Sequence, residues 1–123
     1  MANENETVPG EEMTGLPSGQ RVILQEVIWN DDGPRGRTAR FRFIAPDIAR
    51  QGGKIDFDMA AADMQALCEG FALSQIDGED PPPAQIIISL SDRALPFGEA
   101  DPDATQFFEA YRVEDGTCIW EMF

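Results

Sequence analysis

The sequence predicts an α+β domain built on a single antiparallel sheet of about five strands, in the chain order β-β-α-β-β-β, with one helix packed on one face. Three observations support this fold class. Apolar and polar residues alternate with a period of two in several short segments, the period becomes helical in one segment, and an Asp-Gly pair separates the last two apolar runs. A chain of 123 residues is long enough to bury one ordinary core.

The beginning of the chain is expected to be a flexible acidic tail at residues 1–18, followed by a single domain at residues 19–123. The tail combines prolines, glycines and glutamates with few large apolar residues. The first strand is expected over residues 20–29, which are rich in β-branched side chains. The next segment, residues 30–36, has the sequence NDDGPRG and predicts a turn.

The second strand is expected at residues 37–45, where the two faces alternate strictly. Phe41 and Phe43 fall on one face, and Arg40 and Arg42 fall on the other. This pattern is typical of a half-buried strand, and it predicts a hairpin with the strand before it.

A helix is expected from Met59 to Leu73, because apolar residues recur there at helical spacing. Asp58 is the expected N-cap, and Asp56 is the alternative. Gly70 is expected near the end of this helix.

The C-terminal part is expected to contain the remaining three strands. After a proline-rich acidic connector, residues 85–91 (QIIISLS) predict a buried strand. Residues 107–113 and 117–123 predict two further strands. Asp115-Gly116 lies between them, and such a pair is a strong hairpin signal.

The composition restricts the function. The chain has 23 acidic and 9 basic residues, a formal net charge of -14 and no histidine. Such an acidic surface repels phosphate backbones and anionic lipid. We therefore expect a soluble chain that does not bind nucleic acid. The sequence also lacks an apolar run long enough for a transmembrane helix. The missing histidine excludes histidine-based nucleophile systems and histidine-ligated metals, and we expect no cofactor.

The candidate interaction surface is a basic patch formed by Arg37, Arg40 and Arg42. Arg40 and Arg42 share one strand face and are suited to binding a carboxylate on a protein partner. The alternative is that these arginines lie on a solvated sheet face and balance neighbouring acids such as Glu26.

The acidic loop at residues 92–103 contains the candidate metal ligands Glu99, Asp101 and Asp103. They alternate as hard oxygen ligands of a divalent cation can. The loop does not match an EF-hand, because the positions that need a glycine and a glutamate hold glutamine and arginine. The alternative is a connector whose prolines and glycine shape a turn.

Cys68 and Cys118 are a candidate disulfide between the helix and the last strand. If formed, this bond closes a loop of about fifty residues and stabilises the fold by about 4 kcal/mol. The alternative is a pair of buried free thiols, which a cytosolic chain keeps reduced.

Four stretches resemble a family of small uncharacterised alphaproteobacterial proteins: residues 17–20 (PSGQ), 41–46 (FRFIAP), 85–93 (QIIISLSDR) and 111–118 (YRVEDGTC). The resemblance implies an export leader and therefore the periplasm. The N-terminus printed here has neither a basic nor an apolar leader region, and without a removed leader we expect a cytoplasmic protein.

Some members of that family carry the label acetolactate synthase, which does not fit these residues. A thiamine-diphosphate enzyme of that class needs a Gly-Asp-Gly motif, whereas this chain offers only Asp77-Gly78-Glu79. The family supplies no catalytic residues.

These observations predict a non-enzymatic accessory protein or protein-interaction module with a protein partner. Two alternatives stay open: a small-ligand or divalent-metal-binding protein that uses the loop at residues 92–103, and a regulatory subunit of a larger enzyme.

Overall fold

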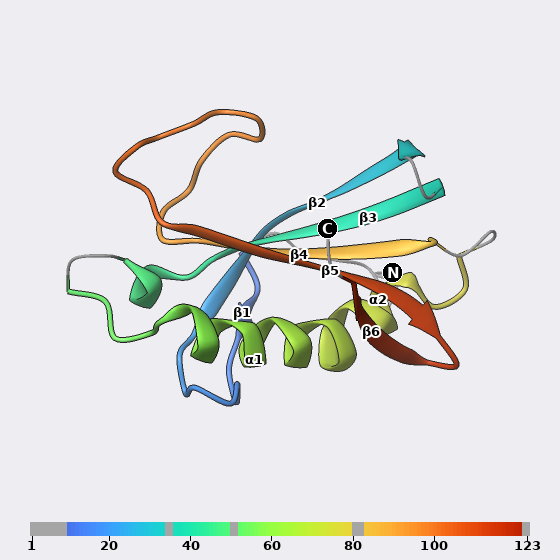
Figure 1. Cartoon of the computed structure of the whole chain (residues 1–123), viewed down its shortest axis with the longest axis horizontal. Helices are drawn as coiled ribbons and strands as arrows, with labels where there is room; N and C mark the ends of the chain where they lie inside the picture. The colour runs from blue at the N-terminus through green and yellow to red at the C-terminus, as the bar shows by residue number, and fades with distance from the viewer. Residues whose placement is uncertain (1–9, 34–35, 50–51, 80–82, 122–123) are drawn as a thin grey trace.

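The computed structural model describes residues 10–33, 36–49, 52–79 and 83–121. One six-stranded sheet has the strand order β1-β2-β3-β4-β5-β6, and a helical segment lies along one face of it (Figure 1). The expected α+β class is confirmed. The strands are β1 (Glu12–Met13), β2 (Val22–Gly33), β3 (Gly36–Ile44), β4 (Gln85–Ser91), β5 (Gln106–Glu114) and β6 (Thr117–Glu121).

The sheet is mixed, which corrects the expectation of a purely antiparallel sheet. β3 and β4 are parallel, with Thr38 opposite Gln85 and Ile44 opposite Ser91, whereas the other neighbouring strands are antiparallel. The helical segment between β3 and β4 covers residues 57–76, a length of about 30 Å. It carries the chain back along the sheet, so β4 starts at the same end as β3, as in other β-α-β units.

The helical segment starts two residues earlier than expected. It consists of α1 (Phe57–Leu67), the π-helical turn η2 (Cys68–Ala72) and α2 (Leu73–Ile76), and a short 3-10 helix, η1 (Pro46–Ile48), precedes it. Asp56 is the N-cap rather than Asp58, because its carboxylate accepts a hydrogen bond of 2.9 Å from the N–H of Met59.

The helical segment also continues past Leu73, its expected end, to Ile76. The N–H of Leu73 donates to the carbonyl of Cys68, which is the wider hydrogen bonding of a π turn. This turn keeps the backbone helical as far as Ile76. Phe71 within it packs edge-to-face on Phe41 and Phe43, with ring centroids 6.0 and 6.1 Å apart.

The core lies between the helix and one face of the sheet, and the predicted faces of β3 are confirmed. Phe41 and Phe43 are buried on the helix side, and the alternation places Arg40 and Arg42 on the opposite face. We call this opposite side of the sheet the helix-free face. The other buried apolar side chains of the core include Leu24, Met64, Leu67, Ile86, Ile88, Leu90 and Tyr111.

The segment before β2 is attached to the helix by polar contacts. Asp63 on α1 is fully buried and accepts hydrogen bonds from the N–H and hydroxyl of Ser18 and from Nε2 of Gln20, at 2.9, 2.5 and 2.7 Å. Residues 10–18, within the expected tail, thus contribute β1 and this contact, whereas residues 1–9 lie outside the described residues.

The C-terminal hairpin forms where it was expected. Asp115 and Gly116 have φ values of 52° and 73°, the two positive values of a type I′ turn. Tyr111 lies opposite Trp120, and Val113 lies opposite Cys118. In the described part of the chain, no helix is long and apolar enough to cross a membrane.

Candidate functional site

The centre of the helix-free face carries two arginines of β3. Arg40 lies between Ile28 of β2 and Ile87 of β4, and Arg42 lies opposite Glu26. These two members of the predicted interaction surface therefore share one face. Arg40 lies between apolar residues there, whereas Arg42 lies opposite an acidic residue.

Arg42 is a structural residue. It is only 5% exposed, forms an ion pair with Glu26 and donates a hydrogen bond of 3.0 Å to the carbonyl of Leu95. The Nε2 atom of Gln25 donates to the same carbonyl at 2.8 Å. Arg42 therefore holds the loop between β4 and β5 against the sheet, and its charge is balanced internally.

Arg40 is half-buried and has no ion-pair partner among the residues that the structure describes. The ring of Phe97 lies 5.3 Å from its guanidinium carbon and 5.4 Å from that of Arg42. Burial lowers the pKa of Arg40, and the positive charge of Arg42 lowers it further. An anion placed against Arg40 would be stabilised by a positive charge that has no counter-ion in the described part of the chain.

Arg37, the third residue of the predicted surface, lies on the helix side of the sheet. Its guanidinium carbon is 4.3 Å from the centre of the Trp29 ring, and it forms an ion pair of 3.2 Å with Glu79. Side chains alternate along a strand, so residues 37 and 40 must point to opposite faces. The structure thus brings Arg40 and Arg42 together and separates Arg37 from them.

The acidic loop surrounds its own cation. Arg93 contacts the carboxylates of Asp92 and Asp101 at 3.1 and 3.6 Å and donates to the carbonyl of Asp103 at 3.0 Å. The hydrogen bonds that Arg93 donates to the carboxylate of Asp92 are the main reason that the pKa of Arg93 is raised. Asp101 also accepts a hydrogen bond from the N–H of Asp103, and Glu99 is exposed. Within the described ranges, no group of three potential metal ligands is found.

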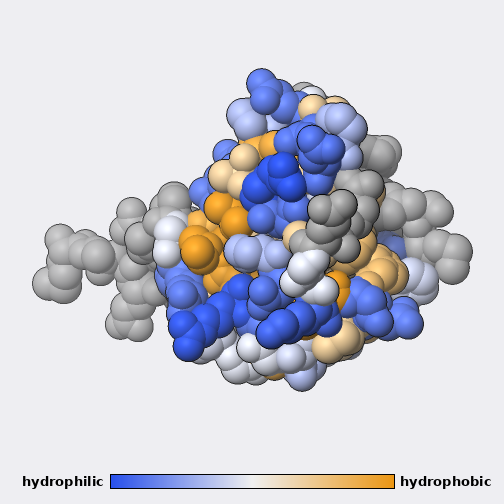
Figure 2. Space-filling model, turned by 90° about the vertical axis from the view of Figure 1, so that its left-hand side faces the viewer, coloured by the Kyte–Doolittle hydropathy of each residue, from blue (hydrophilic) through white to orange (hydrophobic). Residues whose placement is uncertain are grey.

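Figure 2 shows the end of the molecule where this loop lies near the segment that follows β3. Hydrophilic residues dominate this face, and hydrophobic atoms form a patch among them. A depression of about 560 Å³ is lined by the two segments. Its charged residues, Lys54 and Asp56, have opposite signs, and Asp56 is already engaged as the N-cap of α1.

A second hollow, which the sequence did not predict, lies between α1 and the β5–β6 hairpin. We call it the aromatic groove; it has a volume of about 340 Å³ and is lined by Phe57, Ala61, Ala62, Gln65, Glu109, Tyr111 and Trp120. Phe57 and Trp120 are 45% and 51% exposed. Burial raises the pKa of Tyr111, and the negative charges of Glu109 and Glu69 add to this effect.

Sequence patterns gave only a partial signal for this groove. Phe57 precedes the expected start of the helix, so it was not assigned to a helix face. Trp120 was expected within a strand, and its spacing of two from Cys118 does place both on the helix side. The exposure of Trp120 depends on how far the helix reaches along the hairpin.

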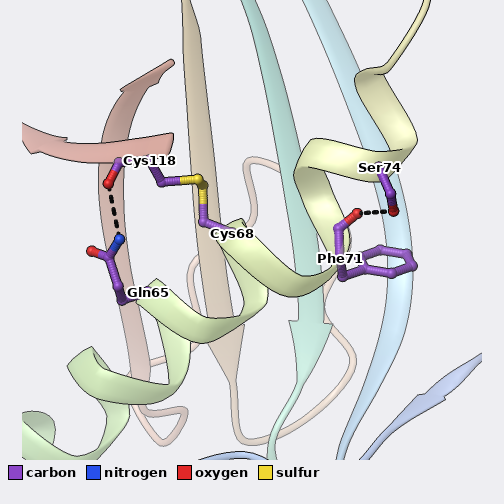
Figure 3. Close-up of a disulfide and its surroundings, with 5 residues drawn as sticks. All are labelled: Gln65, Cys68, Phe71, Ser74 and Cys118. Atoms are coloured by element: carbon purple, nitrogen blue, oxygen red, sulfur yellow. Dashed lines mark hydrogen bonds between the residues drawn. A yellow bond between two sulfur atoms is a disulfide. The ribbon is translucent and has the colours of Figure 1, made fainter. Parts of the chain in front are cut away.

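The two cysteines lie next to Gln65, one of the residues that line the groove (Figure 3). The sulfur atoms of Cys68 and Cys118 are 2.13 Å apart, at disulfide distance, and their Cα atoms are 6.3 Å apart. Next to this pair, Nε2 of Gln65 donates a hydrogen bond of 2.9 Å to the carbonyl of Cys118. The pair joins η2 to β6, so it connects the helix to the outermost strand of the sheet.

Fold and surfaces together define a small α+β protein with a mixed sheet covered by a helix on one side. The chain belongs to a family of unknown function (DUF6497), whose model matches residues 1–123. The resemblance to an uncharacterised family is confirmed at this level. Neither the curated proteins nor the solved structures contain a match to the chain.

Proposed function

We propose that this protein is a non-enzymatic protein-interaction module that binds an acidic segment of a partner protein through the surface around Arg40. The observation that carries the proposal is a half-buried arginine without a carboxylate partner among the described residues, in a chain that has 23 acidic residues. The partner's carboxylate would supply the missing counter-ion.

The other arginines in the described ranges support this argument. Each of the five at positions 21, 37, 42, 93 and 112 has a carboxylate within ion-pair distance. Removing a charge from water is costly unless the charge is paired. Arg40 bears part of this cost, and among the described residues it gains contact with the ring of Phe97 but no ion pair, so binding of a carboxylate is expected to be favourable there.

The surroundings of Arg40 suit a protein partner. Phe97 and Phe108 are 56% and 52% exposed, and Phe108 lies on the helix-free face two strands from Arg42. Arginines and aromatic side chains are enriched among the residues that contribute most to protein–protein binding. The segment we expect therefore combines one acidic side chain with apolar neighbours.

The test is quantitative co-purification from the native source with three forms of the protein. We expect the wild type to recover a stoichiometric partner, Arg40→Glu to lose most of it, and Arg21→Glu to retain it. Arg21→Glu is the matched control, because it makes the same charge change as Arg40→Glu at a side chain that is 75% exposed. Equal melting temperatures for the three forms would exclude unfolding, and equal recovery of the partner by all three would contradict the proposal.

We also propose that the protein works in an oxidising compartment, the periplasm. The buried pair Cys68 and Cys118 at disulfide distance supports this, because disulfides persist in such compartments. The family resemblance supports it independently. Alkylation of free thiols at the moment of lysis, followed by mass spectrometry, should find both cysteines protected. Alkylation of both would place the protein in a reducing compartment.

A further inference from the structure

We infer that the aromatic groove is a second docking site, which binds an extended, basic segment of another protein that adds to the edge strand β6. This site goes beyond the Arg40 surface. The groove lies on the helix side of the sheet, at its edge, whereas Arg40 lies on the helix-free face.

The orientation of the β6 backbone supports the addition of a strand. β6 is the last strand of the sheet, and Thr117 pairs with Glu114 across the two-residue turn. In an antiparallel pair, main-chain groups point alternately toward the neighbour and away from it. The side chain of Gln65 donates a hydrogen bond to the carbonyl of Cys118, so the main-chain groups of Cys118 point away from β5 (Figure 3). The main chain of Trp120 must then also face outward, toward an incoming strand.

The shape of the groove also suits an added strand. Its walls are largely apolar, formed by Phe57, Ala61 and Ala62 on α1 and by Trp120 on β6. A hollow of about 340 Å³ is at the small end of the range for ligand sites, and it fits one or two side chains. Every second side chain of a strand added to β6 would point toward the groove. Strand addition of this kind combines main-chain hydrogen bonds with pockets for alternate side chains.

The charge of the groove favours a basic segment. Glu109 accepts a hydrogen bond from the indole Nε1 of Trp120 and has no ion-pair partner in the described ranges. It lines the groove together with apolar residues, so a lysine or arginine is the complementary side chain. A second copy of the chain is disfavoured as the occupant, because two bodies of net charge -14 repel each other.

The probes are three synthetic peptides of about eight residues. The first alternates valine and threonine around one central lysine, the second replaces the lysine by glutamate, and the third replaces a central valine by proline. Binding is followed by the fluorescence of Trp120 in a Trp29→Phe background and by the amide resonances of Cys118 and Trp120. We expect the lysine peptide to bind at least about fivefold more tightly than the glutamate peptide, and the proline peptide to lose binding because it breaks strand pairing.

Two isosteric variants separate charge from packing. Glu109→Gln keeps an acceptor for the indole of Trp120, and we expect the preference for lysine to fall below about twofold. Glu114→Gln makes the same charge change at the turn, outside the groove, and should keep the preference. Trp120→Ala should weaken all binding.

Each alternative result would overturn the inference. Failure of the lysine peptide to bind at millimolar concentration, equal binding of the glutamate peptide, or undisturbed binding to Trp120→Ala would each do so. Arg40→Glu should leave peptide binding unchanged. The groove and the Arg40 surface therefore fail or succeed independently.

Discussion

The two sides of the sheet are held in different ways. On the helix side, Phe41, Phe43 and Tyr111 are buried under α1, and the Cys68–Cys118 pair joins the helix to β6. On the helix-free face, the ion pair between Arg42 and Glu26 joins β3 to β2, and two hydrogen bonds to the carbonyl of Leu95 hold a loop over the sheet. Apolar packing is distributed over many contacts, whereas the polar contacts depend on a few atoms. Substitutions should therefore cost more stability on the helix side than on the helix-free face.

Removal of the cysteine pair should give the largest effect on the helix side. The two residues are 50 positions apart, and closing such a loop is expected to contribute about 4 kcal/mol to the free energy of unfolding. The double variant Cys68→Ala, Cys118→Ala should lose most of this contribution to the free energy of unfolding, as measured by urea titration. The wild type measured in reductant is the control, and its free energy of unfolding should fall toward that of the double variant. A loss below about 1 kcal/mol would show that packing alone holds the helix against β6.

Alkaline pH should test the burial of Tyr111 on the same side. Its pKa is raised in the folded protein, mainly by burial, so above pH about 10 the unfolded chain loses the tyrosine proton first. The unfolded state then binds fewer protons, and stability falls as pH rises, by up to about 1.4 kcal/mol per pH unit. Below pH about 10 this contribution to the pH dependence is absent.

Urea titrations between about pH 9 and about pH 11 would measure this slope. Tyr111→Phe is the matched control, because it keeps the ring and removes the titration, and its unfolding curve should lack this component. Tyr111 is the single tyrosine of the chain, so tyrosinate absorbance reports its ionisation directly. Ionisation of the folded protein near pH 10 would contradict the burial argument.

The helix-free face should show a smaller effect that separates its two arginines. Arg42→Ala leaves Glu26 without its partner and releases the carbonyl of Leu95. Because the Glu26 side chain is 38% exposed, solvent screens the loss, and we expect about 1–2 kcal/mol. Arg40→Ala should change stability by less than about 0.5 kcal/mol, because no internal ion pair is lost. Equal losses in the two variants would show that Arg40 is as structural as Arg42.

The same comparison explains what the sequence could predict. Period-two alternation assigned Phe41 and Phe43 to the core and Arg40 and Arg42 to the other face, because strand geometry is local. The parallel pairing of β3 with β4 was missed, since it depends on the helix returning the chain along the sheet. The helical segment continues past its expected end at Leu73 to Ile76 through a π turn that packs Phe71 against Phe41, and no local pattern predicts this turn.

The candidate sites follow the same rule. Sequence alone suggested that arginines on one strand face could bind a carboxylate. Only the three-dimensional contacts show that Glu26 balances Arg42 while Arg40 has no ion-pair partner in the described ranges. The aromatic groove depends on how α1, β5 and β6 meet, so Glu109 and Trp120 could not be paired from their positions in the sequence.

The smallest expected effect is that of calcium on the loop at residues 92–103. A ligand that binds only the folded state raises the melting temperature, but here Arg93 already lies among Asp92, Asp101 and the carbonyl of Asp103. A calcium ion would have to displace this internal cation. We therefore expect millimolar calcium to change the melting temperature of the wild type by less than about 1 °C.

Arg93→Gln sharpens this test, because it removes the internal cation while the carboxylates stay. If calcium raises the melting temperature of Arg93→Gln and not that of the wild type, the loop has the oxygen ligands of a cation site and Arg93 occupies it. A rise in the wild type would instead show that the loop binds metal in competition with Arg93. The first result would show that the charge of Arg93 is balanced within the chain, as the charge of Arg42 is, whereas we propose that a partner balances the charge of Arg40.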